Sequence, residues 1–392
     1  MMDVAVGQTK IFRRPVIGIF HALVFWGFCV IVIGSIEMVI DGLSGSEKSL
    51  QVLGIVYKVI IASGDIFGLV VAISILIFLA RRLFFHISRF EGTEMNAKTH
   101  IDANIALSMI FLLMISLLGM NTAYCAHQNA ASLTVAGDYP VSSQLSFFFA
   151  GLSLGTMQII YETCWWSHIL LIFIFANILP YSKHFHVFMS VPNVFLSRLE
   201  PLGKLYNMNS VTREVRLMLN PNASVSMPAE NAPIERFGVK DCDDVSWKSY
   251  FDSLSCTQCG RCTSVCPANI TGKKLSPRKI MMDLRARMNE KGPGLVKNGK
   301  EYTDQKSLIR DYISEEELWA CTTCNACAQE CPININQPSI IVDMRRYLVM
   351  EEGSAPGQLK ALFSNIENNG APWQFSPEDR LLWATDLEIK IH

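Results

Sequence analysis

The sequence predicts an all-α protein in two parts, a bundle of four transmembrane helices followed by a helical domain with two cysteine clusters. Residues 1–190 contain 10 Lys/Arg and 10 Asp/Glu, whereas residues 191–392 contain 24 and 25. Because half of all 392 residues are hydrophobic, this contrast separates an apolar membrane half from a soluble half. The net charge of −1 gives no basic excess and therefore argues against nucleic-acid binding.

Four apolar segments are long enough to cross a bilayer. A helix needs about 20 apolar residues, because it rises about 1.5 Å per residue through about 30 Å of hydrocarbon. We expect spans at about 15–38, 54–80, 103–126 and 163–186. The first lacks the small-residue cleavage site of a signal peptide, so we expect a retained anchor. The apolar segment 145–160 abuts the fourth span without a loop, and we expect an interfacial helix there.

The distribution of Lys and Arg predicts the orientation of the bundle. Four of these residues lie between the second and third spans, and five follow the fourth within residues 183–216. On the other side, loop 127–144 contains none and loop 41–53 contains only Lys48. We therefore expect a multi-pass protein of the cell's inner membrane, with both termini and the cysteine-rich half in the cytoplasm.

Three histidines lie where a haem could be bound within the bundle. His168 and His186 are 18 residues apart, which is five helical turns, so they would project from one face at depths that differ by about 27 Å. That spacing suits two haems stacked across a bilayer. His21, about two turns into the first span, lies at a depth that would let it share an iron with His186.

The run from Pro180 to His186, with a histidine 18 positions earlier, resembles the last helix of the di-haem membrane subunit of respiratory nitrate reductases. This resemblance implies that His186 and His21 bind a cytoplasm-proximal haem b and that His168 binds a distal one. The second histidine of the family's earlier helix would fall at Ile31.

The sixth ligand of a distal haem is therefore open between His127, Met38 and no ligand at all. His184 stands two positions from His186, which on a helix turns it away by about 200°. It would bond a haem propionate or a quinone, or lie at the level of the lipid headgroups.

Asp65 lies near the middle of the second span, where an ionised carboxylate is costly and marks a functional site by default. Lys58 is two turns earlier on the same helical face. The pair is interpreted either as a structural ion pair or as part of a proton relay that serves quinone chemistry.

The soluble half contains the run Cys-x-x-Cys-x-x-Cys-x-x-x-Cys-Pro twice, 65 residues apart. This is the bacterial ferredoxin pattern, in which three close thiolates bind one [4Fe-4S] cluster and the fourth binds the other. Zinc ribbons do not use eight cysteines in this order, and a cytoplasmic domain does not form stable disulfides. The predicted ligand sets are Cys256, Cys259, Cys262 and Cys331 for one cluster, and Cys321, Cys324, Cys327 and Cys266 for the other.

Capping signals predict helices around the two cysteine runs. Ser276 and Pro277 begin a helix that we expect to run to about Glu290 and to end at Gly292. Ser314 and Glu317 form a capping box before the second run. Further helices are expected at 247–254, 338–350, 357–367 and 377–386. The predicted domains are a haem b domain (1–190), a connector (191–245) with loop-like stretches at 220–224 and 228–233, a ferredoxin domain (246–350) and a helical C-terminal extension for partner docking (351–392).

A four-span cytochrome b bundle followed by an α-helical dicluster ferredoxin domain resembles the membrane iron–sulfur proteins related to heterodisulfide reductase, including electron-transfer-flavoprotein:menaquinone oxidoreductases. The resemblance implies a respiratory subunit that passes electrons between cytoplasmic clusters and menaquinone through haem b. The sequence shows no nucleophile with its base and no nucleotide motif, so no catalytic residue is assigned.

Fused members of that group continue into a domain with paired CCG motifs. This sequence has no Cys-Cys pair, so we expect a separate CCG-domain subunit or an electron-transfer flavoprotein as the partner. The alternative is a haem-free membrane anchor that carries a ferredoxin module.

Overall fold

The computed structural model describes residues 1–220, 236–299 and 301–387. These residues form helices and one isolated bridge between Ile309 and Ile313, with no strand among them, so the predicted all-α class is confirmed. The chain divides into two compact units. Unit 1 comprises 1–199, 251–265 and 326–335, and unit 2 comprises 200–250, 266–325 and 336–392. Most of the predicted loop-like connector, residues 221–235, lies outside the described residues, as do 388–392.

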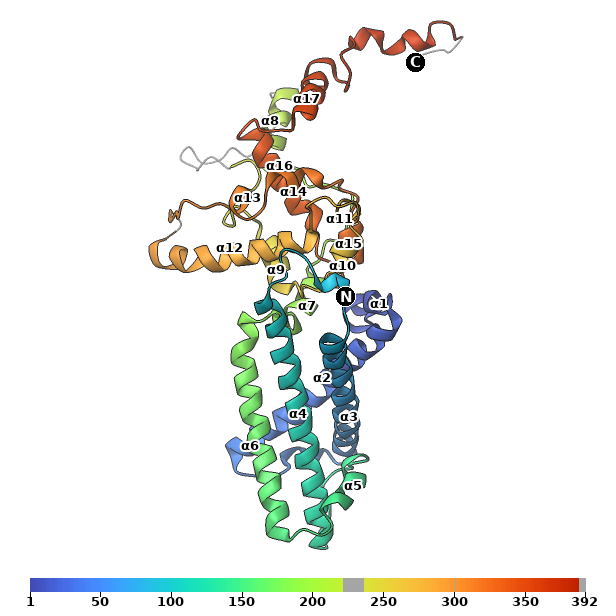
Figure 1. The fold of residues 1–392 in the computed structure, drawn as a ribbon, viewed down its shortest axis with the longest axis vertical. Coiled ribbons are helices and arrows are strands. Elements are labelled where there is room, and N and C mark those ends of the chain that lie inside the picture. The colour runs from blue at the N-terminus through green and yellow to red at the C-terminus, as the bar shows by residue number, and fades with distance from the viewer. Residues whose placement is uncertain (221–235, 300, 388–392) are drawn as a thin grey trace. The chain divides into compact units, whose positions relative to one another are not determined.

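Unit 1 contains four long apolar helices: α2 (Pro15–Ser44), α3 (Ile55–Phe84), α4 (Ala97–Ala130) and α6 (Leu154–Ile178). Each is long and apolar enough to cross a membrane, which confirms the predicted number of spans. Consecutive helices pack on one another, α2 on α3, α3 on α4 and α4 on α6 (Figure 1). The described residues show no comparable packing between α2 and α6.

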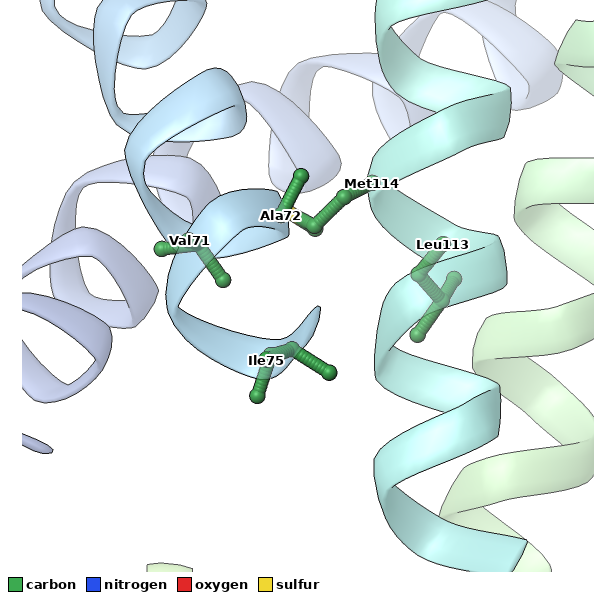
Figure 2. Close-up of a cluster of buried hydrophobic side chains, with 5 residues drawn as sticks. All are labelled: Val71, Ala72, Ile75, Leu113 and Met114. Carbon is green, nitrogen blue, oxygen red and sulfur yellow. The ribbon is translucent and has the colours of Figure 1, made fainter. Parts of the chain in front are cut away.

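The centre of this bundle is an apolar contact between α3 and α4. Val71, Ala72 and Ile75 of α3 face Leu113 and Met114 of α4 (Figure 2). Residues one and four positions apart share a face of a helix, so this spacing presents one continuous apolar stripe to the neighbouring helix.

Small residues allow the helices of this bundle to approach closely. A Cβ added at Gly27 of α2 would lie 2.6 Å from the Cγ2 of Val71, so only glycine fits there. Close backbone approach through small residues is a common source of stability between membrane helices.

The fourth span differs from its predicted bounds of 163–186. It begins at Leu154, where the Ser153 side chain caps the helix, so the expectation of an interfacial helix over 145–160 is wrong for its second half. The first half forms two short turns, α5 (Ser142–Leu145) and η4 (Ser146–Phe149).

Pro180 removes a backbone donor just after α6 ends at Ile178. The chain then passes through two 3-10 turns, η5 (Leu179–Tyr181) and η6 (Lys183–Phe185), before α7 (His186–Phe195) begins. The prediction that His168 and His186 share one continuous helix is therefore wrong.

The other short elements of unit 1 surround the bundle and the cysteine segments. They are η1 (Met2–Val6), α1 (Thr9–Phe12), η2 (Ser49–Leu53), η3 (Ser88–Phe90), α10 (Arg261–Ser264) and α15 (Ala326–Glu330). Helix α9 (Trp247–Ser255) precedes the first cysteine run, as predicted.

Unit 2 contains most of the predicted soluble helices. They are α12 (Pro277–Asn298), α14 (Glu315–Ala320), α16 (Gln337–Met350) and α17 (Gly357–Asn369), with shorter α11 (Pro267–Ile270) and α13 (Leu308–Asp311). The Ser276 cap and the capping box of Ser314 and Glu317 are confirmed. Residues 377–384 form a 3-10 helix, η7 (Pro377–Ala384), and the predicted connector contains an unpredicted helix, α8 (Asn209–Leu219).

Helix α12 does not end at Gly292 as predicted but continues to Asn298. Tertiary contacts account for the extension, because Lys291 pairs with Asp241 and Asp243, and Gly294 packs directly against the Tyr302 ring. Such contacts outweigh the weak helix propensity of glycine and proline at this point.

Unit 2 is also held by a buried ionic centre around α12. The Arg287 side chain is fully buried and donates to both carboxylate oxygens of Asp241, at 2.8 and 2.7 Å, and to Asp304 at 2.6 Å. Lys291 adds a bond of 3.0 Å to Asp241. These cations neutralise the Asp241, Cys242 and Asp243 group, which is therefore a structural anchor rather than a metal site.

Candidate iron–sulfur and haem sites

The two cysteine loops repeat one backbone conformation. Gln258 and Gly260 have φ of 57° and 73°, and the corresponding Thr323 and Asn325 have φ of 53° and 60°. Left-handed residues that alternate with right-handed ones turn successive N–H groups inward and form an anion-binding nest. Three of these four residues are not glycine, so both loops adopt an unfavourable conformation that a bound cluster would require.

Unit 1 brings together the thiols predicted for one cluster. Burial raises the pKa of Cys262 well above its usual value, and the neighbouring Cys259, Cys256 and Cys331 raise it further. Burial and Cys259 likewise raise the pKa of Cys331 to about 12, although Cys331 Sγ accepts the Ile335 N–H at 3.4 Å. The fourth cysteine of the second run thus lies beside the first loop, which is the arrangement that the crossed ligand pairing requires.

Three of the four thiols predicted for the other cluster lie in unit 2. Burial raises the pKa of Cys321, the Thr323 N–H and Arg345 oppose the rise, and the nearby Cys266 and Cys324 add to it. Cys327 belongs to the segment 326–335 of unit 1. The eight thiols and the inward N–H groups fit two cubane clusters, while the assignment of each ligand stays a prediction.

Within unit 1, the first loop is attached to the N-terminal segment that precedes α2. Arg261 donates to the carbonyls of Lys10, at 2.8 Å, and Ile11, at 3.3 Å. Lys10 in turn donates to the Cys331 carbonyl at 3.2 Å. The sequence interpretation used these N-terminal cations only for topology, so it missed their contacts with the cysteine segments.

Helix α7 and the segment after it add further links to the cysteine segments of unit 1. The Asn193 side chain donates to the Ile333 carbonyl at 2.9 Å, and the Ser255 hydroxyl donates to the Met189 carbonyl at 3.3 Å. The helix that begins at His186 is therefore fixed to both cysteine segments of the unit.

Two of the predicted haem ligands have one ring nitrogen already engaged. His168 is 2% exposed, and its Nδ1 lies 3.0 Å from the Leu113 carbonyl and 2.9 Å from the Ser116 hydroxyl. His186 Nδ1 lies 3.1 Å from the Lys183 carbonyl. A metal-binding histidine usually donates its second N–H to such a carbonyl, which leaves Nε2 for the iron.

His21 lies near enough to His186 for their charges to interact, and its buried Nδ1 has no hydrogen-bond partner among the described residues. The pair therefore fits the proposed sharing of one iron. His184 does not point away from its neighbour as predicted, because the helix is interrupted, and its ring lies 5.7 Å from that of His186.

The distal ligand is not resolved by the contacts of unit 1. Met38 is buried at 7% exposure, His127 is half-buried near the end of α4, and Ile31 packs against the α3 and α4 core. Since the contacts of His168 described above are to Leu113 and Ser116 of α4, its proposed iron ligation stays a prediction.

Asp65 is buried, but Lys58 is exposed, so the predicted ion pair between them is wrong. The carboxylate instead accepts the backbone N–H groups of Val141, at 2.7 Å, and Ser142, at 2.9 Å, and the Ser142 hydroxyl. Asp65 thus fixes the loop that leads into α5, and its role in a quinone-linked relay stays a prediction.

These features define a class, the membrane iron–sulfur proteins with a dicluster ferredoxin domain. Residues 255–335 match the family described as "4Fe-4S dicluster domain". The chain is 30% identical over 98% of its length to the probable iron-sulfur-binding oxidoreductase FadF of Bacillus subtilis, of which it covers 54%. It is 27% identical over 98% of its length to the EtfAB:quinone oxidoreductase of Syntrophomonas wolfei, of which it covers 53%.

A third relative is one of the subunits of a ferredoxin/F(420)H(2)-dependent CoB-CoM heterodisulfide reductase of Methanosarcina acetivorans, 36% identical over 26% of this chain and 48% of its own. The predicted resemblance to heterodisulfide-reductase-related iron–sulfur proteins is thereby confirmed. The chain spans about half the length of the first two relatives. No solved structure matches the chain.

Proposed function

We propose that this chain passes electrons between two cytoplasmic [4Fe-4S] clusters and the menaquinone pool through haem b in the membrane. The observation that carries the proposal is the composition of unit 1. One compact unit contains the four apolar helices, the histidines His21 and His186, and the complete ligand set predicted for the first cluster. A cluster fixed to the bundle in this way lies where a one-electron relay into the membrane requires it.

The residues that would hold each group follow from the site. Cys256, Cys259, Cys262 and Cys331 would hold one cluster, and Cys321, Cys324, Cys327 and Cys266 the other. His21 and His186 would hold a haem b, and His168 a second one. When bound, these groups supply one-electron redox chemistry, and the protein sets their ligation and potentials. The carbonyls of Lys183 and Leu113 hold two imidazoles with Nε2 available.

The partner, the sidedness and the direction of electron flow belong to the same proposal. The Lys and Arg distribution favours cytoplasmic termini, and the name of the S. wolfei relative favours an electron-transfer flavoprotein as donor. A CCG-domain protein of the heterodisulfide reductase type is the other candidate. The C-terminal extension exposes Trp373 (67%), Phe375 (68%) and Trp383 (70%), which suits docking of such a partner.

The visible spectrum of the purified full-length chain tests the proposal. We expect a haem b band in the dithionite-reduced minus oxidised spectrum, and its loss in His186→Ala. His86→Ala is the matched control, because His86 lies in the exposed loop between α3 and α4 and pairs with Glu91 there. Wild-type protein with intact clusters but no haem band would instead establish the alternative, a haem-free anchor for a ferredoxin module.

A further inference from the structure

We propose that two arginines, Arg261 for the first cysteine loop and Arg345 for the second, raise the reduction potentials of the two clusters separately. The inference rests on the proposed function, because it assumes that the two clusters are present. It goes further by assigning a positioning residue to each cluster, neither of which belongs to the ligand pattern.

Arg261 is 6% exposed and stands between the second and third cysteines of the first loop. Its guanidinium is fixed by the two bonds to the Lys10 and Ile11 carbonyls. There its charge interacts with the thiols of Cys259 and Cys331. It therefore faces two ligands predicted for the same cluster, one from each cysteine run.

The carboxylate nearest in effect to this site is already compensated. Glu330 interacts with Arg261, but it also pairs with Arg13 at 3.4 Å and with Arg14 at 3.9 Å. Lys10, whose charge interacts with Cys331, adds a further cation on the same side. The net charge around the first loop is therefore positive.

Arg345 holds the equivalent position for the second loop, but it comes from α16. Its Nε donates to the Leu318 carbonyl at 2.9 Å, and its Nη2 donates to the carbonyl of Cys321. The guanidinium carbon lies 5.0 Å from the centre of the Trp319 ring, and its charge interacts with the Cys321 thiol. The residue that corresponds to Arg261 in the second loop is Ala326, which has no charge.

A fixed cation stabilises the reduced form of a cluster, because that form carries one more negative charge. Burial strengthens this attraction, since the medium around the charge screens it less than water does. Arg261 also lies near enough to His21 for their charges to interact. The same residue therefore links the first cluster to the proposed haem site.

An EPR-monitored redox titration of the full-length chain tests this assignment in wild type, Arg261→Gln and Arg345→Gln. At fixed potential we expect Arg261→Gln to lower the reduced-to-oxidised ratio of one cluster signal about tenfold, which is about 59 mV for a one-electron couple. Arg345→Gln should lower that of the other signal. Arg261→Lys keeps the charge and should retain most of the wild-type potential.

If both signals move together, or if neither moves while the iron content stays at the wild-type value, the inference is overturned. If Arg261→Gln fails to assemble its cluster, Lys10→Gln tests the same field from outside the loop, and it must shift the same signal in the same direction. Wild-type protein without any cluster signal would contradict the proposed function instead, so the two failures are distinguishable.

Discussion

The two cysteine loops differ in their surroundings although they share one backbone conformation. The first loop carries its own cation, Arg261, and is attached to the N-terminal segment of unit 1. The second has Ala326 at that position, and Arg345 reaches its first cysteine from α16 in unit 2. The ligand pattern is therefore local and repeated, whereas the charges that surround it come from different parts of the chain.

Exchange of the fourth cysteines should break the comparison most severely. If the ligand sets are crossed, Cys331→Ser removes the cluster of the first loop and Cys266→Ser removes that of the second. Iron content should fall to about half in each variant, and each should lose a different EPR signal. Loss of the same signal in both variants would contradict the crossed pairing, and Cys29→Ser, which alters an exposed thiol of α2, is the control.

The ionic centre of unit 2 should be the next most sensitive feature, because it anchors the helix between the two cysteine runs. Arg287→Met leaves Asp241 and Asp304 without their main cation, and loss of one partner of a buried pair costs about 3–5 kcal/mol. Thermal unfolding should show this loss. Lys306→Gln removes an exposed pair with Glu290 and should change stability by less than about 1 kcal/mol. Equal effects of the two changes would contradict the account of the anchor.

In unit 1, Asp65→Asn should destabilise the loop that leads into α5. Hydrogen bonds to a charged group contribute about 1.5–3 kcal/mol, and the variant weakens those from Val141 and Ser142. Quinone-linked turnover per folded molecule should stay near that of wild type. A large loss of turnover in a protein of normal stability would establish the proton relay instead.

The smallest effect concerns the left-handed residues of the two loops. Gly260→Ala places a Cβ at φ of 73° and should cost about 1–2 kcal/mol, whereas Asn325→Gly at φ of 60° should be neutral or stabilising. Thermal unfolding of the cluster-loaded proteins measures both. The reverse order would show that the two loops do not share one conformation when loaded.

The sequence predicted those parts of the fold that depend on local chemistry. Four apolar runs, the Ser276 cap and the capping box at Ser314 each follow from neighbouring residues, and all three features are present. Helix ends were harder to predict, because tertiary contacts of Lys291 and Gly294 carry α12 past Gly292.

The surroundings of the candidate site could not be predicted from spacing. The fourth span was assumed to be continuous through Pro180, which placed His168 and His186 on one helix. Arg345 lies 24 residues from Cys321, and no periodic pattern joins them. Such pairs become visible only when the fold brings distant segments together.

The central claim is that clusters, haem and quinone form one electron path within the chain, and anaerobic stopped-flow reoxidation tests it most directly. Full-length protein reduced with dithionite is mixed with a water-soluble naphthoquinone, and the cluster and haem absorbances are followed together. We predict that both are reoxidised in wild type, and that the clusters of His186→Ala stay reduced on the same time scale. Equally fast cluster reoxidation in His186→Ala would contradict the account.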